Sequence, residues 1–349
     1  MKKLFILLVI MAVAFAGCNQ APKQGADKAT ANKYAGLLDR AKGVFQPLPA
    51  IAENPDNPVT PEKVKLGQTL YFDTRLSKEN HIACNSCHKL DAFGVDNEPT
   101  SPGDAGERGG RNSPTSLNAA FQFAQFWDGR AKDVEDQAGG PITNPIEMSM
   151  PDQEFVIKRI RGFKGYEAMY IAAFPGEKEP ISYMNTQKAI GAFERELVTP
   201  TRWDDYLKGN DAALTDAEKQ GLQTFMDAGC TACHTGPLLG GGMFQKFGLT
   251  ANYWDFTKSG KIDVGRYDVT KNEADKYQFK VSQLRNIEKT YPYFHDGSVA
   301  SLDEAVKIMG KVQFNKDLTP QEVADIVTFL KSLTGTVPAE LATVPPMPV

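Results

Sequence analysis

Two short motifs in the sequence have the residue types and spacing that attach a haem covalently. Residues 84–88 (CNSCH) and 230–234 (CTACH) both follow the pattern Cys-x-x-Cys-His. Two cysteines three positions apart on one helical turn reach both vinyl groups of a haem, and the adjacent histidine brings a ring nitrogen to the iron. The residues concerned are Cys84, Cys87, His88, Cys230, Cys233 and His234.

Zinc is the competing interpretation of a single motif of this kind. A structural zinc site usually needs four protein ligands. The chain has 5 cysteines, and the fifth, Cys18, lies near the N-terminus in a leader-like segment, so none remains to complete a zinc site or to form a disulfide. Two motifs in one chain therefore predict two covalently bound haem c groups.

The sixth coordination position of each iron needs a separate assignment. His81 lies only seven residues before the first motif, too close to pass around the edge of that haem. Met309 follows His234 by 75 residues and precedes the terminal helix, where cytochrome c domains commonly supply a methionine, whereas Met243 follows His234 by only nine residues. We therefore expect His234 and Met309 to bind the iron of the second haem (haem 2). A soft thioether ligand favours Fe(II) and raises the reduction potential, which suits storage of an electron.

The first haem (haem 1) has no obvious sixth ligand in the sequence. An iron with an open position in a redox protein indicates that a substrate binds there. Peroxide is the substrate we expect, since cleavage of its O–O bond requires an open iron, an acid–base group and two electrons. A chain with two haems can hold those electrons.

Residues 1–17 have the features of an export leader. Two lysines are followed by an apolar run over residues 4–16, which is too short to span a bilayer comfortably. Small residues then precede Cys18, as in a lipoprotein cleavage site where Cys18 becomes the lipidated N-terminus; an ordinary secretory leader is the alternative. Residues 18–45 predict a flexible tether, because they are rich in Ala, Lys, Gln and Gly. We therefore expect a periplasmic protein that meets the membrane through its lipid anchor alone.

The remaining sequence predicts helices around the two motifs. Signals for a helix N-terminus, with Ser or Thr at the N-cap and an acidic first turn, occur at residues 60–62, 215–218, 301–304 and 319–322. No run of alternating strand residues is present. The predicted fold class is mostly α, with two cytochrome c-like haem domains and long loops: residues 46–205 for peroxidatic haem 1 and residues 206–349 for electron-transfer haem 2. The net charge of −4 offers no concentrated basic face to a nucleic acid.

Four further stretches resemble the bacterial dihaem cytochrome c peroxidases, a family related to MauG. The similarity runs over most of the chain after about residue 50, in the expected order and spacing. The stretches are residues 110–115 (GRNSPT), 126–130 (FWDGR), 145–148 (PIEM) and 292–298 (PYFHDGS).

The resemblance implies roles for individual residues near the haems. Glu147 matches the catalytic carboxylate above the peroxidatic haem, which moves a proton between the two oxygens of H2O2. Gln137 matches a polar residue of the same pocket, and Trp127 matches an aromatic residue between the haems that assists electron transfer. Met309 lies fourteen residues after His295, as the family's methionine ligand should. His295 itself matches a structural or propionate-side residue.

The resemblance also implies a calcium ion and partners. Asn112, with the backbone carbonyls of Thr290 and Pro292, matches a calcium site between the domains, and oxygen ligands of this kind suit a hard cation. The family is usually dimeric, so we expect a homodimer. The expected electron donor is a small exported protein, either a cytochrome c or a copper protein, that docks near haem 2.

One departure from the family pattern concerns the loop before residue 110. Many members carry a histidine there that caps haem 1 in the oxidised enzyme and leaves on activation. This chain has Asp104 instead, seven residues before Arg111. A carboxylate can bind Fe(III) weakly but replaces imidazole poorly. We therefore expect haem 1 to be five-coordinate or water-bound even in the oxidised protein.

Two other functions compete with peroxide reduction at this point. A MauG-like protein-modifying oxidase also lacks the capping histidine, but it has a tyrosine where this chain has Met309. A non-enzymatic dihaem electron carrier would have two saturated irons and no need for Glu147. Replacement of Glu147 by glutamine separates the carrier from the enzymes.

Overall fold

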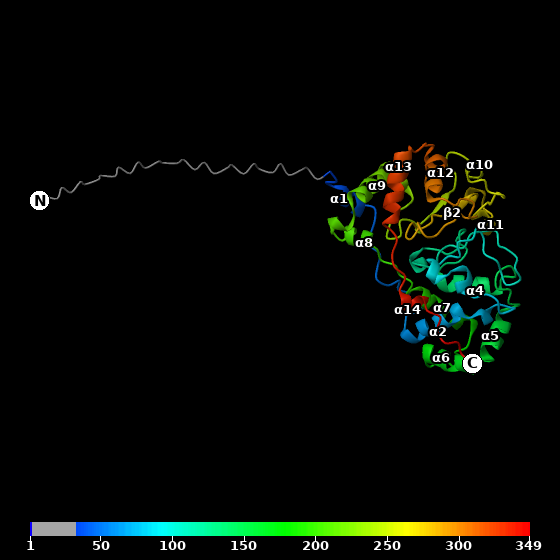
Figure 1. The fold of residues 1–349 in the computed structure, drawn as a ribbon. Coiled ribbons are helices and arrows are strands. Elements are labelled where there is room, and N and C mark those ends of the chain that lie inside the picture. The colour runs from blue at the N-terminus through cyan, green and yellow to red at the C-terminus, as the bar shows by residue number, and fades with distance from the viewer. Residues whose placement is uncertain (2–32) are drawn as a thin grey trace. The chain divides into compact units, whose positions relative to one another are not determined.

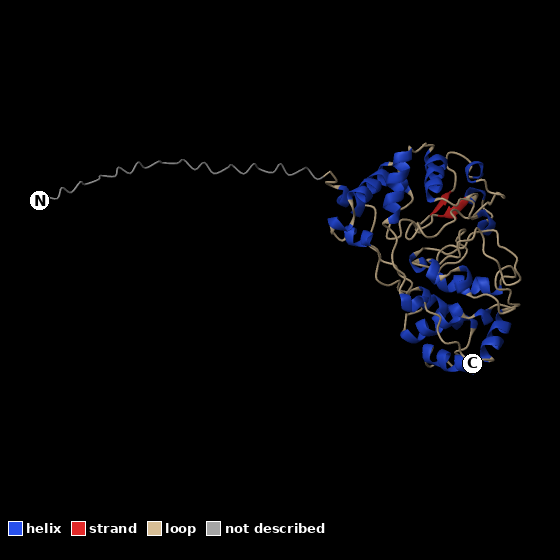
Figure 2. Cartoon of the chain, viewed as in Figure 1, coloured by secondary structure: helices blue, strands red, loops and turns tan. Residues whose placement is uncertain are grey.

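Helices are the main regular secondary structure in the computed structural model, which describes Met1 and residues 33–349 (Figure 1). The predicted leader after Met1, the predicted lipidation site Cys18 and most of the predicted tether lie outside the described residues. One short antiparallel pair, β1 (Phe244–Lys246) and β2 (Gln278–Lys280), forms the sheet of the described chain (Figure 2). The predicted class, mostly α with long loops, is confirmed.

One group of helices surrounds the first Cys-x-x-Cys-His motif. Its members are α2 (Pro61–Phe72), α3 (Cys84–Cys87), α4 (Val134–Thr143), α5 (Gln153–Arg161), α6 (Lys164–Ala173) and α7 (Tyr183–Glu194). α2 crosses α7 at Gly67, where a Cβ atom would lie 1.9 Å from the carbonyl oxygen of Ala189. Only glycine allows the two backbones to approach so closely, and the buried Leu66, Leu70 and Phe193 pack beside the crossing.

A second group surrounds the second motif. Its helices are α1 (Leu37–Lys42), α8 (Arg202–Leu207), α9 (Asp216–Asp227), α10 (Trp254–Thr257), α11 (Tyr267–Thr270), α12 (Leu302–Phe314) and α13 (Pro320–Lys331). α9 crosses α13 in the same manner, because a Cβ atom on Gly221 would lie 2.0 Å from the carbonyl oxygen of Asp325. In both groups, the helix with this glycine is the one that precedes a haem motif.

Short 3-10 helices and long loops connect these elements. The 3-10 helices are η1 (Thr74–Leu76), η2 (Leu90–Ala92), η3 (Ala119–Phe121), η4 (Asp211–Ala213), η5 (Cys230–Ala232) and η6 (Glu273–Asp275). Long irregular stretches lie between α3 and α4, where Asn112 and Trp127 are found, and between β2 and α12, where Thr290 and Pro292 are found.

The C-terminal segment returns to the first helix group. It contains α14 (Ala339–Ala342), which lies beside α2 (Figure 1). The Gln68 side-chain amide donates to the Leu341 carbonyl oxygen at 3.2 Å, and the Gly165 N–H donates to the carbonyl oxygen of Val349 at 3.1 Å. Residues 337–349 therefore pack with the helices of haem 1, whereas Leu333 and Gly335, directly after α13, are hydrogen-bonded to Asn286.

The structure corrects the end of the predicted tether. The tether was predicted to extend to residue 45, but α1 lies within it and Leu37, Ala41 and Phe45 are buried. These three side chains recur every four residues, which places them on one face of a helical segment. The polar composition of the surrounding residues hid this short apolar pattern.

The structure also places the predicted domain boundary differently. The boundary between residues 205 and 206 falls inside α8, whose Trp203 packs edge-on against Phe329 of α13 with ring centroids 5.2 Å apart. Phe45 packs on the same Trp203 ring at 5.4 Å. α8 and the segment around residue 45 therefore belong with the haem 2 helices.

The predicted helix starts agree with the structure. Thr60 accepts the Lys63 N–H, and full capping boxes begin α9 at Thr215 and α13 at Thr319. Ser301 caps α12, which contains Met309 and ends at Phe314.

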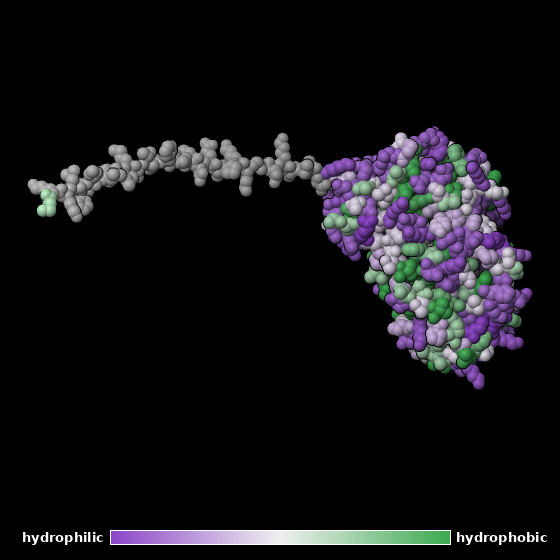
Figure 3. All heavy atoms as spheres, in the orientation of Figure 1, coloured by the Kyte–Doolittle hydropathy of each residue, from purple (hydrophilic) through white to green (hydrophobic). Residues whose placement is uncertain are grey.

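No helix in the described part of the chain is long and apolar enough to cross a membrane. On the face drawn in Figure 3, hydrophilic and hydrophobic side chains of residues 36–349 are interspersed.

Candidate active site

Each Cys-x-x-Cys-His motif faces a cavity of its own. The cavity at the first motif, here the haem 1 cavity, has a volume of about 730 Å³, and the haem 2 cavity at the second motif has about 240 Å³. Met243 lines neither of these cavities. The predicted residues on the haem 1 cavity are Cys84, Cys87, His88, Gln137 and Glu147, and those on the haem 2 cavity are Cys230, Cys233, His234, Thr290, Pro292 and Met309.

A backbone carbonyl orients each motif histidine. His88 is the C-cap of α3, and its Nδ1 lies 3.0 Å from the carbonyl oxygen of Pro114. The Nδ1 of His234 lies 2.9 Å from the carbonyl oxygen of Leu239. An Nδ1–H that donates to a carbonyl leaves Nε2 unprotonated and able to bind a metal. Burial lowers the pKa of both histidines, which favours the same neutral form.

Glu147 lies in the loop that follows α4. Asn144 is the C-cap of that helix, and its side-chain amide donates to Glu147 Oε1 at 2.9 Å. Burial raises the pKa of Glu147 above its ordinary value, although the charge of Arg130 and the bond from Asn144 oppose this effect. Gln137, on α4, lines the same cavity. The haem 1 cavity therefore combines a carboxyl group of raised pKa with a neutral amide.

Trp127 lies where the two cavities meet. It lines both of them, as Asn112 and His295 also do. Its indole N–H donates to the carbonyl oxygen of Asn112 at 2.8 Å, and its own carbonyl oxygen accepts the Lys280 N–H at 2.8 Å. These bonds fix Trp127 between the two cavities.

The three predicted calcium ligands all line the haem 2 cavity. The Asn112 N–H donates to the His295 carbonyl oxygen at 2.7 Å. The Asn112 side-chain amide donates to the Glu98 carbonyl oxygen at 2.9 Å. In the described part of the chain, no group donates to the side-chain oxygen of Asn112 or to the carbonyl oxygens of Thr290 and Pro292. The same part contains no group of three or more His, Cys, Asp and Glu residues that could hold a metal, so a cation here would depend on neutral oxygens.

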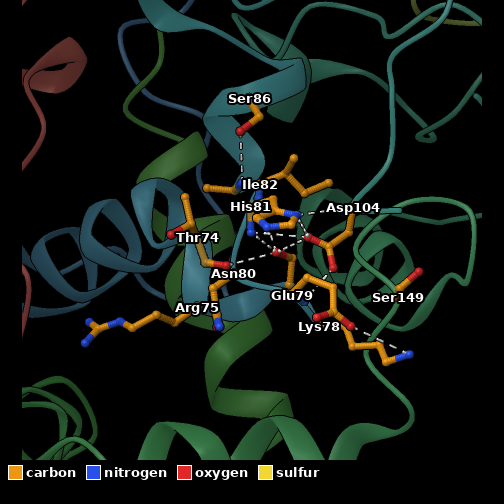
Figure 4. Close-up of polar contacts among 12 residues, drawn as sticks. Thr74, Arg75, Lys78, Glu79, Asn80, His81, Ile82, Ser86, Asp104 and Ser149 are labelled. Atoms are coloured by element: carbon orange, nitrogen blue, oxygen red, sulfur yellow. Dashed lines mark hydrogen bonds and ion pairs between the residues drawn. The ribbon is translucent and has the colours of Figure 1, made fainter. Parts of the chain in front are cut away.

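Asp104 does not line the haem 1 cavity. Its buried carboxylate faces residues 77–81, where it accepts the Ser77 O–H at 2.8 Å and the Glu79 N–H at 2.6 Å (Figure 4). The His81 N–H lies 3.3 Å from the same carboxylate, and the His81 ring is 68% exposed. Burial raises the pKa of Asp104, but these hydrogen bonds outweigh it and leave the pKa below its ordinary value. Because the carboxylate of Asp104 already accepts these hydrogen bonds, it is not placed to bind the iron weakly, as the sequence allowed.

Lys280 is a site residue that sequence reasoning missed. It lies on β2 and lines the haem 2 cavity, and its buried ammonium donates to the side-chain oxygen of Gln122. No carboxylate of the described residues forms an ion pair with it. Burial lowers the pKa of Lys280 to about 7, although Asp128 opposes this effect. The only sequence signal is a charged residue within the short run Phe279–Val281, which equally suits a surface strand.

His295 is a second buried basic side chain without an anionic partner. Both of its ring nitrogens lack a hydrogen bond, and aromatic rings of Phe247, Tyr253 and Phe279 surround it. Buried polar groups are nearly always paired, and a buried cation without an anion is costly. An unpaired imidazole and an unpaired ammonium beside one cavity therefore fit a bound group that carries carboxylates, as haem does.

Comparison with known proteins identifies both halves of the chain. Residues 61–212 match the family model described as di-haem cytochrome c peroxidase, and residues 218–334 match the model for cytochrome c. Cytochrome c551 peroxidase of Pseudomonas aeruginosa is 45% identical over 304 residues, which cover 86% of this chain and 87% of that protein. Methylamine utilization protein MauG of Methylorubrum extorquens is 31% identical over 364 residues and covers the whole of both chains.

A solved structure agrees with these matches. The crystal structure of a MauG-like protein associated with microbial copper homeostasis superposes with a TM-score of 0.73 at 30% identity, covering 85% of this chain and 95% of that one. The two haem motifs, the two cavities and these similarities lead to the same conclusion: the chain belongs to the di-haem cytochrome c peroxidase family and carries two haem c groups.

Proposed function

We propose that this chain reduces H2O2 to water with electrons from a small exported redox protein, a cytochrome c or a copper protein. The reaction consumes one H2O2, two protons and two electrons and yields two water molecules. The bound haems would supply the irons that exchange electrons with peroxide and with the donor. The observation that carries the proposal is that Glu147 and Gln137 share one cavity with His88.

Glu147 is the group that moves a proton in this proposal. Its carboxylate accepts a proton from one oxygen of H2O2 and returns it to the other oxygen, which leaves as water. A pKa that burial raises above the ordinary value brings the carboxyl closer to the working pH, where proton transfer in both directions is efficient. The bond from Asn144 orients the carboxylate, and the amide of Gln137 can donate to the second oxygen of peroxide.

The other residues serve electron transfer. His234 and Met309, which line one cavity, would hold the iron of haem 2, and a His/Met pair would give it a high potential. Trp127 is held between this cavity and the haem 1 cavity by hydrogen bonds at its indole and its carbonyl. Trp127 therefore lies where electrons would pass from a haem in one cavity to a haem in the other.

Three further features belong to the proposal. Calcium binds the side-chain oxygen of Asn112 and the carbonyl oxygens of Thr290 and Pro292, to which no donor among the described residues is bonded. The protein is exported to the periplasm, with a leader over residues 1–17 and a lipid on Cys18. The active form is a homodimer. The N-terminal features lie outside the described residues, and they rest on the sequence alone.

The two alternative functions have weaker support. The chain is 45% identical to a cytochrome c551 peroxidase but 31% identical to MauG. A MauG-like oxidase would also need a tyrosine where the haem 2 cavity has Met309. An electron carrier leaves Glu147 and the large haem 1 cavity without a purpose.

A stopped-flow assay of the holoprotein with reduced cytochrome c and H2O2 tests the proposal. Rapid oxidation of the donor, with two donor electrons per peroxide, is the expected result. Donor oxidation that is no faster than in a reaction without enzyme would exclude peroxidase activity.

The Lys280→Met variant tests whether the haem 2 cavity holds an anion beside this lysine. We expect the reduction potential of haem 2 to fall, because loss of the ammonium leaves a propionate uncompensated and favours Fe(III). A tenfold change in the Fe(III)/Fe(II) equilibrium corresponds to about 59 mV and is the order of shift expected. Spectroelectrochemical titration measures it. Lys246→Met, which removes an exposed lysine from the paired strand β1, is the control and should leave the potential unchanged. Equal potentials in all three proteins would contradict the assignment.

A further inference from the structure

The loop that contains Asp104 is docked on the backbone of the Glu147 segment. The Asp104 N–H donates to the Glu147 carbonyl oxygen at 2.8 Å. At Gly103 a Cβ atom would lie 1.9 Å from the carbonyl oxygen of Ile146, so only glycine permits this approach. The loop itself is closed by the Gly103 N–H, which donates to the Glu107 carbonyl oxygen at 2.7 Å. The backbone of Glu147 is therefore held from one side by this loop.

The side chain of Asp104 joins the loop to a third segment, residues 77–81 (Figure 4). Its two carboxylate oxygens accept the Ser77 O–H at 2.8 Å, the Glu79 N–H at 2.6 Å and the His81 N–H at 3.3 Å. The exposed fraction of this side chain is 1%. A buried carboxylate with several donors is a strong anchor, because each charge-assisted bond exceeds a neutral one in strength.

Residues 77–81 are themselves attached to both sides of the haem 1 cavity. The Ser77 hydroxyl accepts the Ile82 N–H at 3.2 Å, just before the first haem cysteine. The Lys78 N–H donates to the Met148 carbonyl oxygen at 2.9 Å, directly after Glu147. On the outer side, the Arg159 guanidinium donates to the Ser77 carbonyl oxygen at 2.5 Å.

We infer that Asp104 is a positioning residue for Glu147: its carboxylate ties the Asp104 loop to residues 77–81 and so fixes the Glu147 carboxyl relative to the haem-attachment segment. This inference rests on the proposed function of Glu147 as the proton-transfer group. It assigns Asp104 a place outside the cavity, with no contact to the iron. The Asp104 side chain is directed away from the cavity, although Ser101, Pro102 and Gly103 of the same loop line it.

Asp104→Asn is the informative substitution. Asparagine keeps the size of the side chain but replaces one acceptor oxygen by an NH2 donor. That donor would face the N–H of Glu79 or the hydroxyl of Ser77, so the anchor loses a bond and gains a repulsion. Ser77→Ala removes the bond from the Ser77 hydroxyl to Asp104 and the bonds that this hydroxyl accepts from the His81 and Ile82 N–H groups. It keeps the Asp104 carboxylate and its bond from the Glu79 N–H, and is the second variant in case Asp104→Asn lowers haem incorporation. Glu107→Gln removes a charge from an exposed side chain of the same loop and is the matched control.

Three readouts on the haem-loaded variants test the inference. We expect kcat/KM for H2O2 to fall at least about tenfold in Asp104→Asn and less in Ser77→Ala, since small displacements of a reacting group are costly. In a Glu147→Gln background, Asp104→Asn should have no further effect, because the two residues act through one group. Deuterium exchange of the peptides that span residues 101–108 and 144–150 should accelerate about tenfold or more in Asp104→Asn. Glu107→Gln should match wild type in all three.

The outcomes separate this inference from the proposed function. If wild type does not react with peroxide, the proposed function fails, and the exchange rates of the two peptides still decide whether Asp104 anchors the Glu147 segment. If wild type reacts and Asp104→Asn reacts and exchanges equally fast, the positioning role is excluded. An Asp104→Asn effect that persists fully in the Glu147→Gln background also excludes it. A change of ferric haem 1 in Asp104→Asn from a six-coordinate to a five-coordinate spectrum would show instead that Asp104 is an iron ligand.

Discussion

Glu147→Gln is expected to lower kcat/KM for H2O2 by about 10²–10⁴-fold, the usual contribution of a positioned general acid–base. Glutamine preserves the size of the side chain and can still accept the hydrogen bond from the Asn144 amide, which reaches Glu147 Oε1 at 2.9 Å. It cannot take up a proton from peroxide and return it. Stopped-flow mixing of the fully loaded protein with H2O2 isolates this step from electron delivery by the donor.

The control for this substitution is Glu154→Gln. Glu154 is an exposed residue in the first turn of α5, so its replacement removes the same charge without a change in the haem 1 cavity. We expect wild-type rates for this variant and unchanged electron transfer from the donor to haem 2 in both. A Glu147→Gln protein that reacts within threefold of wild type would favour the electron carrier over the peroxidase.

The pH dependence of the peroxide reaction follows from the same residue. Glu147 must be ionised to accept a proton, so kcat/KM should rise with pH as the carboxyl loses its proton. Burial raises the pKa of Glu147, so this rise should lie at higher pH than for an exposed glutamate, whose pKa is about 4.3. In Glu147→Gln this rise of kcat/KM with pH should be absent. A rise at the same pH in the variant would show that another group controls it.

The sequence predicted the fold class because helix-capping residues and the two haem motifs are enough to indicate it. The capping residues Thr215 and Thr319 start helices where predicted, and the two haem motifs follow the helices that should precede them. The crossings at Gly67 and Gly221 could not be foreseen, since a glycine in a helix signals close approach only when the partner helix is known. The return of the C-terminal segment to the first helix group is equally a long-range property.

The sequence predicted the site residues that belong to recognisable motifs. It did not predict the residues whose part in the site depends on burial and on neighbouring charges. Glu147, Gln137 and His88 line one cavity although up to 59 positions separate them in the chain. The sequence could not show that Lys280 is buried without a carboxylate partner, because a lysine in a short strand is usually exposed. Nor could it show which way Asp104 points, since the same residue type suits a weak ligand and a backbone cap.

Arg285→Met is expected to lower the free energy of unfolding by about 3–5 kcal/mol at neutral pH, the cost of breaking a buried ion pair. The Arg285 guanidinium is fully buried and donates to both carboxylate oxygens of Asp204, at 2.9 and 2.6 Å. Asp204 also accepts the Leu48 N–H at 2.6 Å, so the pair joins α8, the segment before α2 and the loop after β2. Methionine fills a similar volume but leaves the carboxylate without its counter-charge. Guanidinium denaturation of the haem-loaded protein, followed by circular dichroism, measures the loss.

Two comparisons show whether the loss comes from the buried charge. Arg161→Met breaks an ion pair with Glu179 of similar length, 2.9 Å, but the two side chains are 51% and 80% exposed, so we expect a loss of only about 0–1 kcal/mol.

Burial raises the pKa of Asp204, but the bonds and charge of Arg285 outweigh this and hold the pKa below its ordinary value. A lowered pKa means that the pair stabilises the fold above the unfolded pKa of about 3.9 and ceases to do so as the pH falls through the folded pKa. The difference between wild type and Arg285→Met should therefore shrink in acid, whereas a difference that is independent of pH would indicate lost packing instead of a lost ion pair.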